Sequence, residues 1–220
     1  MIIVAIDESN FIKASDILNK LDSKKCMIKI GSVAFNSIGQ DIVYYAAEKG
    51  FDIFLDLKLH DIPNTVKKSI EGLASLPIQM LSIHTSGGKD MMVAAMEAAY
   101  GTEIKIFGVT VLTSLNDFDT ETIFQRTALE HVKKMIDLAD LAGIDGIVCS
   151  PHELELAGSK KSLLTITPGI RLQDSNDDQN RVMTPKEAIN RGADYLVIGR
   201  PITESRNIKK SLDDIYESIK

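Results

Sequence analysis

The stretch DLKLHDIPNT (residues 56–65) carries charged side chains where a packed α/β fold normally places apolar ones. Residues 52–58 alternate as a strand does, so Phe54, Asp56 and Lys58 share one face and the residues between them share the other. Pro63 suits the first turn of a helix, because proline has no N–H that a helix would need there. The stretch therefore predicts a strand, a short connection that contains Asp61, and a helix.

The rest of the chain repeats this order of strand and helix. Short apolar runs predict strands at Ile2–Ile6, Met27–Ile30, Ile53–Leu57, Met80–His84, Ile104–Val111, Gly146–Cys149, Leu163–Thr167 and Tyr195–Ile198. Helical spacing of apolar residues predicts helices at Phe11–Leu21, Gln40–Lys49, Asn64–Leu76, Asp90–Tyr100, Thr127–Ala142, His152–Gly158, Pro185–Arg191 and Lys209–Ile219. These units predict a (β/α)8 TIM barrel in a single domain, residues 1–220, with its active site at the carboxyl ends of the strands. A doubly wound open sheet is the alternative.

Composition narrows the classes of protein. A chain of 220 residues that is 44% hydrophobic can bury one sizeable core, and its net charge of −6 argues against a general nucleic-acid or membrane-surface binder. The apolar start, Met1–Ile6, is too short for a signal peptide, and no run approaches the roughly 18 apolar residues of a membrane helix. We expect a soluble cytoplasmic protein. Cys26 and Cys149 lie in apolar runs without metal-ligand spacing, which predicts buried free thiols and no metal site.

Charged residues end three successive predicted strands. Asp7 follows the first strand, Lys29 lies in the second, Asp56 lies in the third, and Lys58 directly follows the third. Lysine and aspartate are rarely buried unless they are paired, so a chance accumulation of them at one end of a barrel is improbable. A ring of surface salt bridges at the barrel mouth is the structural alternative, and a functional cluster is the interpretation we favour.

Two later strands end in arginines and turn residues. The last strand runs into Gly199 and Arg200, which resembles the phosphate-binding end of many barrels. The segment Thr167–Arg171 ends the seventh strand and presents a second arginine, Arg171. The polar loop that follows, residues 172–181, is long for a structureless connection. Its composition fits a lid or a disordered surface loop, and its place beside Arg171 favours a lid that closes over a phosphate.

The histidines receive structural interpretations. His84 ends the fourth strand without a nearby nucleophile or metal-ligand set, so we expect a structural role. Strand alternation would turn His60 away from Lys58, and we place His60 outside the site. His131 and His152 fall on predicted helices and are expected at the surface.

Together these motifs resemble the orotidine 5′-phosphate decarboxylase family of the compact bacterial type. The similar segments are Asp7, Lys29, DLKLHDIPNT, Thr113, TPGIR (residues 167–171), DQNRVMTP (residues 178–185) and IGRPIT (residues 198–203). The resemblance covers the chain from Asp7 to the final helices. It implies a homodimeric barrel without a cofactor or metal that converts orotidine 5′-monophosphate to UMP and carbon dioxide, the last step of de novo pyrimidine synthesis.

The resemblance also implies roles for individual residues. Lys29, Asp56, Lys58 and Asp61 would form the catalytic array, in which Lys58 donates the proton and Asp61 reaches the neighbouring subunit's site. The implied substrate contacts are Asp7 and Lys29 to the ribose, Thr65 across the dimer, Thr113 to the pyrimidine, and Arg171, Gln179, Gly199 and Arg200 to the phosphate.

Two rival functions are less well supported. Related barrels that act on sugar phosphates, such as 3-keto-gulonate-phosphate decarboxylase and hexulose-phosphate synthase, share an Asp-x-Lys-x-x-Asp core but use magnesium held partly by an acidic residue on the second strand. Here that position is Lys29, whose ammonium would repel the metal. A barrel that only binds a phosphate ligand would need the arginines but gains nothing from the alternation of Lys and Asp.

Overall fold

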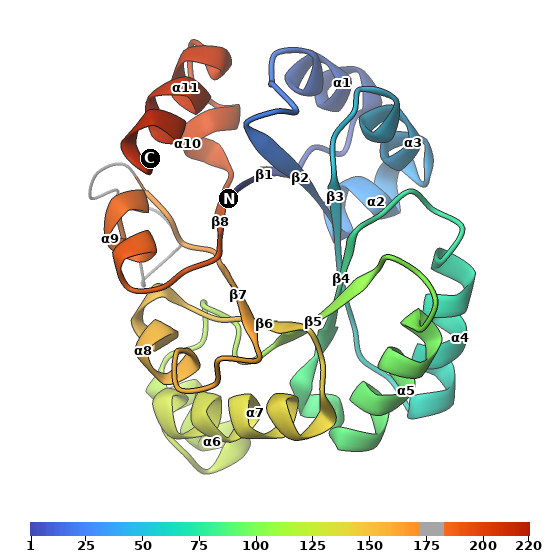
Figure 1. Cartoon of the computed structure of the whole chain (residues 1–220), viewed down its shortest axis with the longest axis vertical. Helices are drawn as coiled ribbons and strands as arrows, with labels where there is room; N and C mark the ends of the chain where they lie inside the picture. The colour runs from blue at the N-terminus through green and yellow to red at the C-terminus, as the bar shows by residue number, and fades with distance from the viewer. Residues whose placement is uncertain (172–182) are drawn as a thin grey trace.

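The computed structural model describes residues 1–171 and 183–220, whose strands form one closed parallel barrel (Figure 1). The strands follow one another in sequence order, and β1 (Ile2–Ile6) pairs with both β2 (Cys26–Gly31) and β8 (Tyr195–Ile198). The remaining strands are β3 (Ile53–Leu59), β4 (Met80–His84), β5 (Lys105–Val109), β6 (Gly146–Val148) and β7 (Leu164–Thr167). The predicted (β/α)8 barrel is confirmed, and the open-sheet alternative is wrong because β8 closes the ring onto β1.

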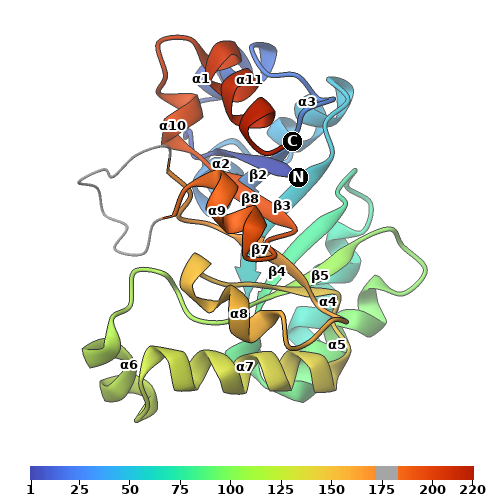
Figure 2. The same cartoon turned by 60° about the vertical axis from the view of Figure 1, so that its left-hand side comes forward.

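Helices cover the outside of the barrel (Figures 1 and 2). Those that helical spacing predicted are α1 (Phe11–Asn19), α3 (Asp41–Glu48), α4 (Pro63–Leu73), α5 (Lys89–Ala99), α7 (Ala128–Ala142), α8 (Leu154–Ala157), α9 (Pro185–Asn190) and α11 (Ile208–Ser218). The sequence did not predict α2 (Ser32–Ile38) or α6 (Asp117–Phe124). The short helix α10 (Arg200–Thr203) has Pro201 in its first turn, a position that suits proline. No helix in the described ranges is long and apolar enough to cross a membrane.

Apolar side chains pack in two layers, one inside the barrel and one between the barrel and the helices. The inner layer consists of Ile3, Ala5, Met27, Phe54, Met80, Phe107, Ile166 and Val197. The outer layer is formed by side chains on the opposite faces of the same strands, which pack against the helices. Examples are Ile2, Val4, Ile53 and Leu55. Because both faces are covered, the strands have the nearly continuous apolar sequences that predicted them.

The third strand is irregular where its charged residues lie. Pairing between β3 and β4 shifts register between Leu55 and Leu59, and Lys58 has a φ of 53°, in the left-handed region that residues with a side chain rarely adopt. Phe54, Asp56 and Lys58 still lie on one side of the strand, as predicted, because all three line the same cavity, but the sequence did not predict the register shift or the left-handed backbone of Lys58. The bulge is a tertiary feature that depends on how β3 meets β4.

His131 is buried, which corrects its expected place at the surface. Its residue is 5% exposed, and its ring stacks on Phe124 with 3.9 Å between ring centroids. The cause is α6, which packs against α7 and which the sequence did not predict. The two cysteines are buried free thiols, as predicted.

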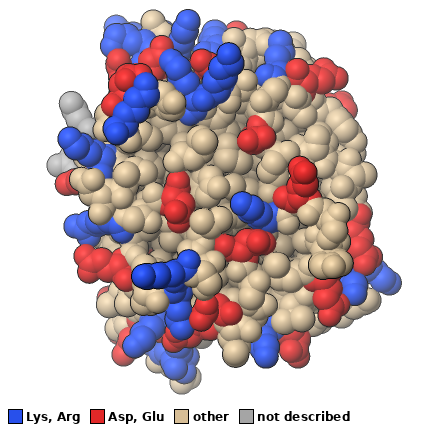
Figure 3. All heavy atoms as spheres, viewed as in Figure 1, with Lys and Arg blue, Asp and Glu red and all other residues tan. Residues whose placement is uncertain are grey.

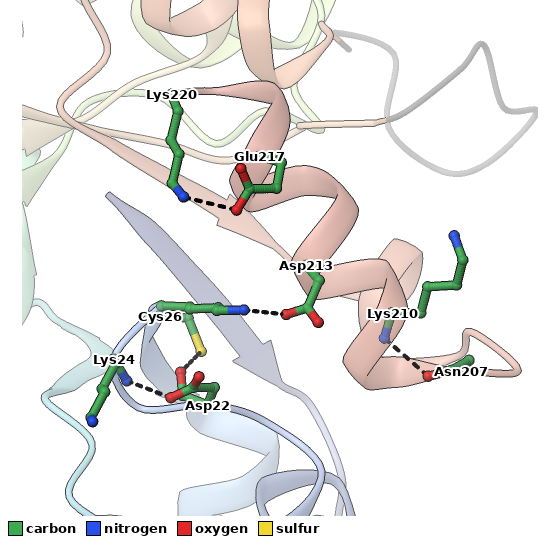
Figure 4. Close-up of polar contacts among 9 residues, drawn as sticks. Asp22, Lys24, Cys26, Asn207, Lys210, Asp213, Glu217 and Lys220 are labelled. Carbon is green, nitrogen blue, oxygen red and sulfur yellow. Dashed lines mark hydrogen bonds and ion pairs between the residues drawn. The ribbon is translucent and has the colours of Figure 1, made fainter.

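The last helix packs beside the segment that enters β2. Lys25 Nζ lies 2.7 Å from Asp213 Oδ1, and Figure 4 shows Asp213 on α11 facing the segment from Asp22 to Cys26, which leads into β2. Figures 1 and 3 view the barrel from the end at which the strands begin, where acidic and basic side chains are interspersed. The candidate site lies at the opposite end, where the strands finish.

Candidate active site

A cavity of about 470 Å³ opens at the carboxyl ends of the strands. Its lining includes eight residues predicted for the site, namely Asp7, Lys29, Asp56, Lys58, Thr113, Arg171, Gly199 and Arg200. These residues come from segments spread over nearly the whole chain, and closure of the barrel is what brings them together. Apolar side chains form part of the wall, including Val109, Val111, Leu112, Val148 and Val197.

Alternating charges form a connected array in this cavity. Lys58 Nζ lies 2.7 Å from Asp56 Oδ2, and Lys29 Nζ lies 3.4 Å from the same oxygen. Lys29 Nζ also lies 3.2 Å from Asp7 Oδ1. The Asp56 carboxylate therefore holds two ammonium groups, and that of Lys29 also connects to a second carboxylate, Asp7, which is nearer to solvent.

Asp56 is the buried centre of the array. Its side chain is 9% exposed, and Oδ1 accepts a hydrogen bond from Ser82 Oγ at 2.8 Å. Burial alone would raise the pKa of Asp56, but the positive charges of Lys29 and Lys58 and the hydrogen bonds from Lys58 and Ser82 outweigh burial and lower it. Asp56 is therefore an anion at neutral pH and can hold both lysines in place.

Both the backbone and the side-chain ammonium of Lys58 make contacts that fix its position. Its backbone N–H donates to Ser82 Oγ at 2.8 Å, and its side chain remains 34% exposed toward the cavity. The ammonium can therefore reach a bound molecule while its position stays fixed by Asp56.

The cavity lining also carries two arginines and two glycines. Arg171 is 7% exposed and donates from a guanidinium nitrogen to the carbonyl of Ile170 at 3.0 Å. Arg200 begins α10, directly after Gly199. A Cβ at Gly199 would lie 3.5 Å from the side chain of Ala5 and 3.9 Å from Asp7 Oδ2, which is ordinary contact and places Gly199 beside the end of β1. Guanidinium groups suit phosphate because they donate two parallel hydrogen bonds.

Two predicted residues lie outside the cavity of their own chain. Asp61 and Thr65 are exposed, and Asp61 Oδ1 accepts a hydrogen bond from the backbone N–H of Ile62 at 2.7 Å. Gln179 and the predicted lid at residues 172–181 lie outside the described residues.

His60 and His84 lie at the rim beside the charged array. Their ring centroids are 5.3 Å apart, and neither residue lines the cavity. Burial lowers the pKa of His84, and the nearby His60 and Lys58 lower it further, while Asp56 opposes them. The two imidazoles border the array without facing the cavity that it lines.

Sequence reasoning missed Ser82 and Glu204. Ser82 bonds to both Asp56 and Lys58, and Glu204 lines the cavity near Arg200. A serine between Met80 and His84 on a buried strand was the available signal for the first. No local pattern marked Glu204.

The model of the orotidine 5′-phosphate decarboxylase / HUMPS family matches residues 1–215. The chain belongs to this family. Relatives of the orotidine 5′-phosphate decarboxylase / HUMPS family span nearly the same length. Orotidine 5′-phosphate decarboxylase of Ehrlichia canis (strain Jake) is 45% identical over 221 residues, which cover 99% of this chain and 97% of that protein. The enzyme of that name from Saccharophagus degradans is 43% identical over 220 residues, covering 97% and 92%.

Solved structures of the family agree with the barrel. Orotidine 5′-phosphate decarboxylase from Lactobacillus acidophilus superposes with a TM-score of 0.87 at 33% identity, covering 99% of this chain and 98% of that one. The structure of orotidine 5′-monophosphate decarboxylase from Methanocaldococcus jannaschii complexed with the inhibitor BMP has a TM-score of 0.81 at 21% identity, over 99% and 97% of the two chains, and supports the fold alone.

Proposed function

We propose that this chain decarboxylates orotidine 5′-monophosphate to UMP and carbon dioxide in pyrimidine biosynthesis. The observation that carries the proposal is the Lys29–Asp56–Lys58 array, which shares one cavity with Arg171 and Arg200. Membership of the family supports the same reaction. The cavity offers a charged centre for the reacting ring and a separate pair of arginines for a phosphate.

The reaction requires a proton donor and a stabilised anion. When the bond between the ring carbon and the carboxylate breaks, carbon dioxide leaves and the electron pair stays on the ring carbon. No neighbouring group of the ring can accept that pair, so the protein has to stabilise it electrostatically. Lys58 supplies both needs, because its ammonium attracts the developing charge and then transfers a proton to the carbon. The neutral amine that remains regains its proton from solvent.

Asp56 contributes in two ways. Its carboxylate fixes the ammonium of Lys58 at 2.7 Å, and its negative charge would lie near the substrate carboxylate. Repulsion between those two anions is relieved when carbon dioxide departs, which favours the transition state over bound substrate. Lys29 limits the cost of burying Asp56, since its ammonium lies 3.4 Å away.

Phosphate binding supplies energy away from the reacting bond. Opposite unit charges about 4 Å apart at an effective dielectric near 20 attract by roughly 4 kcal/mol, which is far less than decarboxylation without a cofactor requires. Contacts from Arg171 and Arg200 to the phosphate would hold the ring against Lys58, so that remote binding energy aligns the reacting groups. Gln179 and Thr113 are proposed as further contacts, to the phosphate and the pyrimidine respectively.

We place the active form as a homodimer in the cytoplasm, with no nucleic-acid or membrane partner. Residues 60–65 are all exposed, and they include an apolar residue, Ile62, that is 67% exposed. An exposed apolar side chain flanked by polar residues fits a protein contact. In such a dimer Asp61 and Thr65 would complete the neighbouring subunit's cavity. Size-exclusion chromatography with light scattering tests this, and a stable monomer with full activity would refute it.

We also propose that the reaction needs no metal. Lys29 Nζ already neutralises Asp7 and Asp56, at 3.2 and 3.4 Å, and would compete with a cation for these carboxylates. Among residues 1–171 and 183–220, no three His, Cys, Asp or Glu side chains are grouped so as to hold a metal ion.

An ultraviolet assay of orotidine 5′-monophosphate loss, run with and without a chelator, tests the function directly. We expect equal rates in both. Absence of turnover would refute the proposed reaction, and loss of activity with chelator that is restored by added magnesium would refute the proposal that the reaction needs no metal.

A further inference from the structure

Ser82 is a polar residue in an otherwise apolar layer. It lies on the inward face of β4, next to Met80 of the inner layer, and is fully buried. A buried hydroxyl without hydrogen bonds is costly, so its partners explain why it is tolerated. Both partners belong to the charged array.

The hydroxyl joins Asp56 to Lys58. Ser82 Oγ donates to Asp56 Oδ1 at 2.8 Å and accepts from the backbone N–H of Lys58 at 2.8 Å. Ser82 itself does not line the cavity, so it would act through these two residues.

Lys58 is the residue whose conformation needs external support. Its φ of 53° is unfavourable for a residue with a side chain, and β3 and β4 shift register around it. In a regular ladder the N–H of Lys58 would donate to a carbonyl of the neighbouring strand. Here it donates to the side chain of Ser82, so the neighbouring strand β4 holds the bulge in β3.

We propose that Ser82 is a positioning residue that fixes the Asp56 carboxylate and the left-handed backbone of Lys58, and thereby directs the Lys58 ammonium into the cavity. The proposal rests on the proposed decarboxylase function. It predicts an effect on the chemical step and little effect on binding, because the phosphate contacts lie elsewhere in the cavity.

The test compares Ser82→Ala with Thr85→Val in the ultraviolet assay. Thr85 is a matched control, because it directly follows β4, is also fully buried, and its hydroxyl donates a hydrogen bond to the carbonyl of Val109 at 2.8 Å. Loss of that bond should lower stability without affecting the array. The readouts are kcat, KM, melting temperature and the pH dependence of kcat/KM.

We expect Ser82→Ala to lower kcat about tenfold or more, the range for a hydrogen bond to a charged group, with KM changed less than about threefold. The acidic limb of the kcat/KM profile should move to higher pH, because the pKa of Asp56 loses one of the hydrogen bonds that lower it. Thr85→Val should retain kcat and the pH profile.

The inference is overturned if kcat and the acidic limb match the unaltered chain, or if Thr85→Val reproduces both changes. If Ser82→Ala does not fold, Ser82→Cys replaces it, since a thiol has similar size but is a weak donor and acceptor, and the same outcomes apply. Turnover by the unaltered chain separates the two proposals. If the unaltered chain does not decarboxylate orotidine 5′-monophosphate, both proposals fail. If it does and Ser82→Ala has the same kcat, only the positioning role of Ser82 fails.

Discussion

Replacing Lys58 by alanine should abolish turnover while leaving the barrel folded. The variant loses an ammonium that lies 2.7 Å from Asp56 Oδ2 and faces the cavity. A charge about 4 Å from the developing carbanion is worth roughly 4 kcal/mol at an effective dielectric near 20, or about a thousandfold in rate. Loss of a positioned proton donor costs a further factor of about 10²–10⁴. The combined decrease in kcat should be about 10⁵ or more.

The fold should survive because the buried carboxylate of Asp56 keeps a positive charge and a hydrogen-bond donor beside it. Lys29 Nζ remains 3.4 Å from its carboxylate, and Ser82 Oγ still donates to it at 2.8 Å. Circular dichroism and melting temperature check folding, and UMP affinity checks that the cavity persists. Lys67→Ala is the control, since Lys67 forms a salt bridge to Glu97 at 2.9 Å on the outside of the barrel. Activity of Lys58→Ala within about tenfold of the unaltered chain would refute the role of Lys58 as the proton donor.

Three further predictions concern the phosphate, acid stability and the thiols. Arg200→Ala should lower kcat/KM for the nucleotide at least tenfold more than for the nucleoside that lacks phosphate, and equal losses on both substrates would contradict the phosphate contact. The lowered pKa of Asp56 means that its stabilising effect is complete above the unfolded carboxyl pKa, near 3.9, and is lost as pH falls through the lower folded value. The difference in unfolding free energy between the unaltered chain and Asp56→Asn should therefore shrink in acid, and a difference independent of pH would exclude this linkage. Burial raises the pKa of Cys26 to about 12 and also raises that of Cys149, so neither thiol should react with a thiol reagent at pH 8 until denaturant is added. Rapid labelling of the folded protein would show that one of them opens to solvent.

Much of the barrel could be predicted from local pattern. Each strand is covered on both faces, so its sequence is an apolar run such as Ile2–Ile6, and each helix carries a periodic apolar stripe. Charged residues at the ends of such runs, Lys29 and Asp56 among them, stood out because burial of an unpaired charge is costly. Local signals of this kind persist in the sequence whatever the distant contacts are.

Long-range contacts decided the rest. Ser82 bonds to Lys58 across 24 positions of the chain, and this contact accompanies a bulge that strand alternation could not predict. His131 is buried by α6, a helix whose own apolar pattern is too weak to have been recognised beforehand.

The sequence by itself determined the order of strands and helices and the charged residues at the strand ends, because periodicity and the cost of burying charge act locally. Only the tertiary structure decided that Asp56 contacts two ammonium groups at once and that Asp61 stays outside its own chain's cavity. Distances between side chains on different strands depend on barrel closure and strand register, and no short segment of sequence determines either of these.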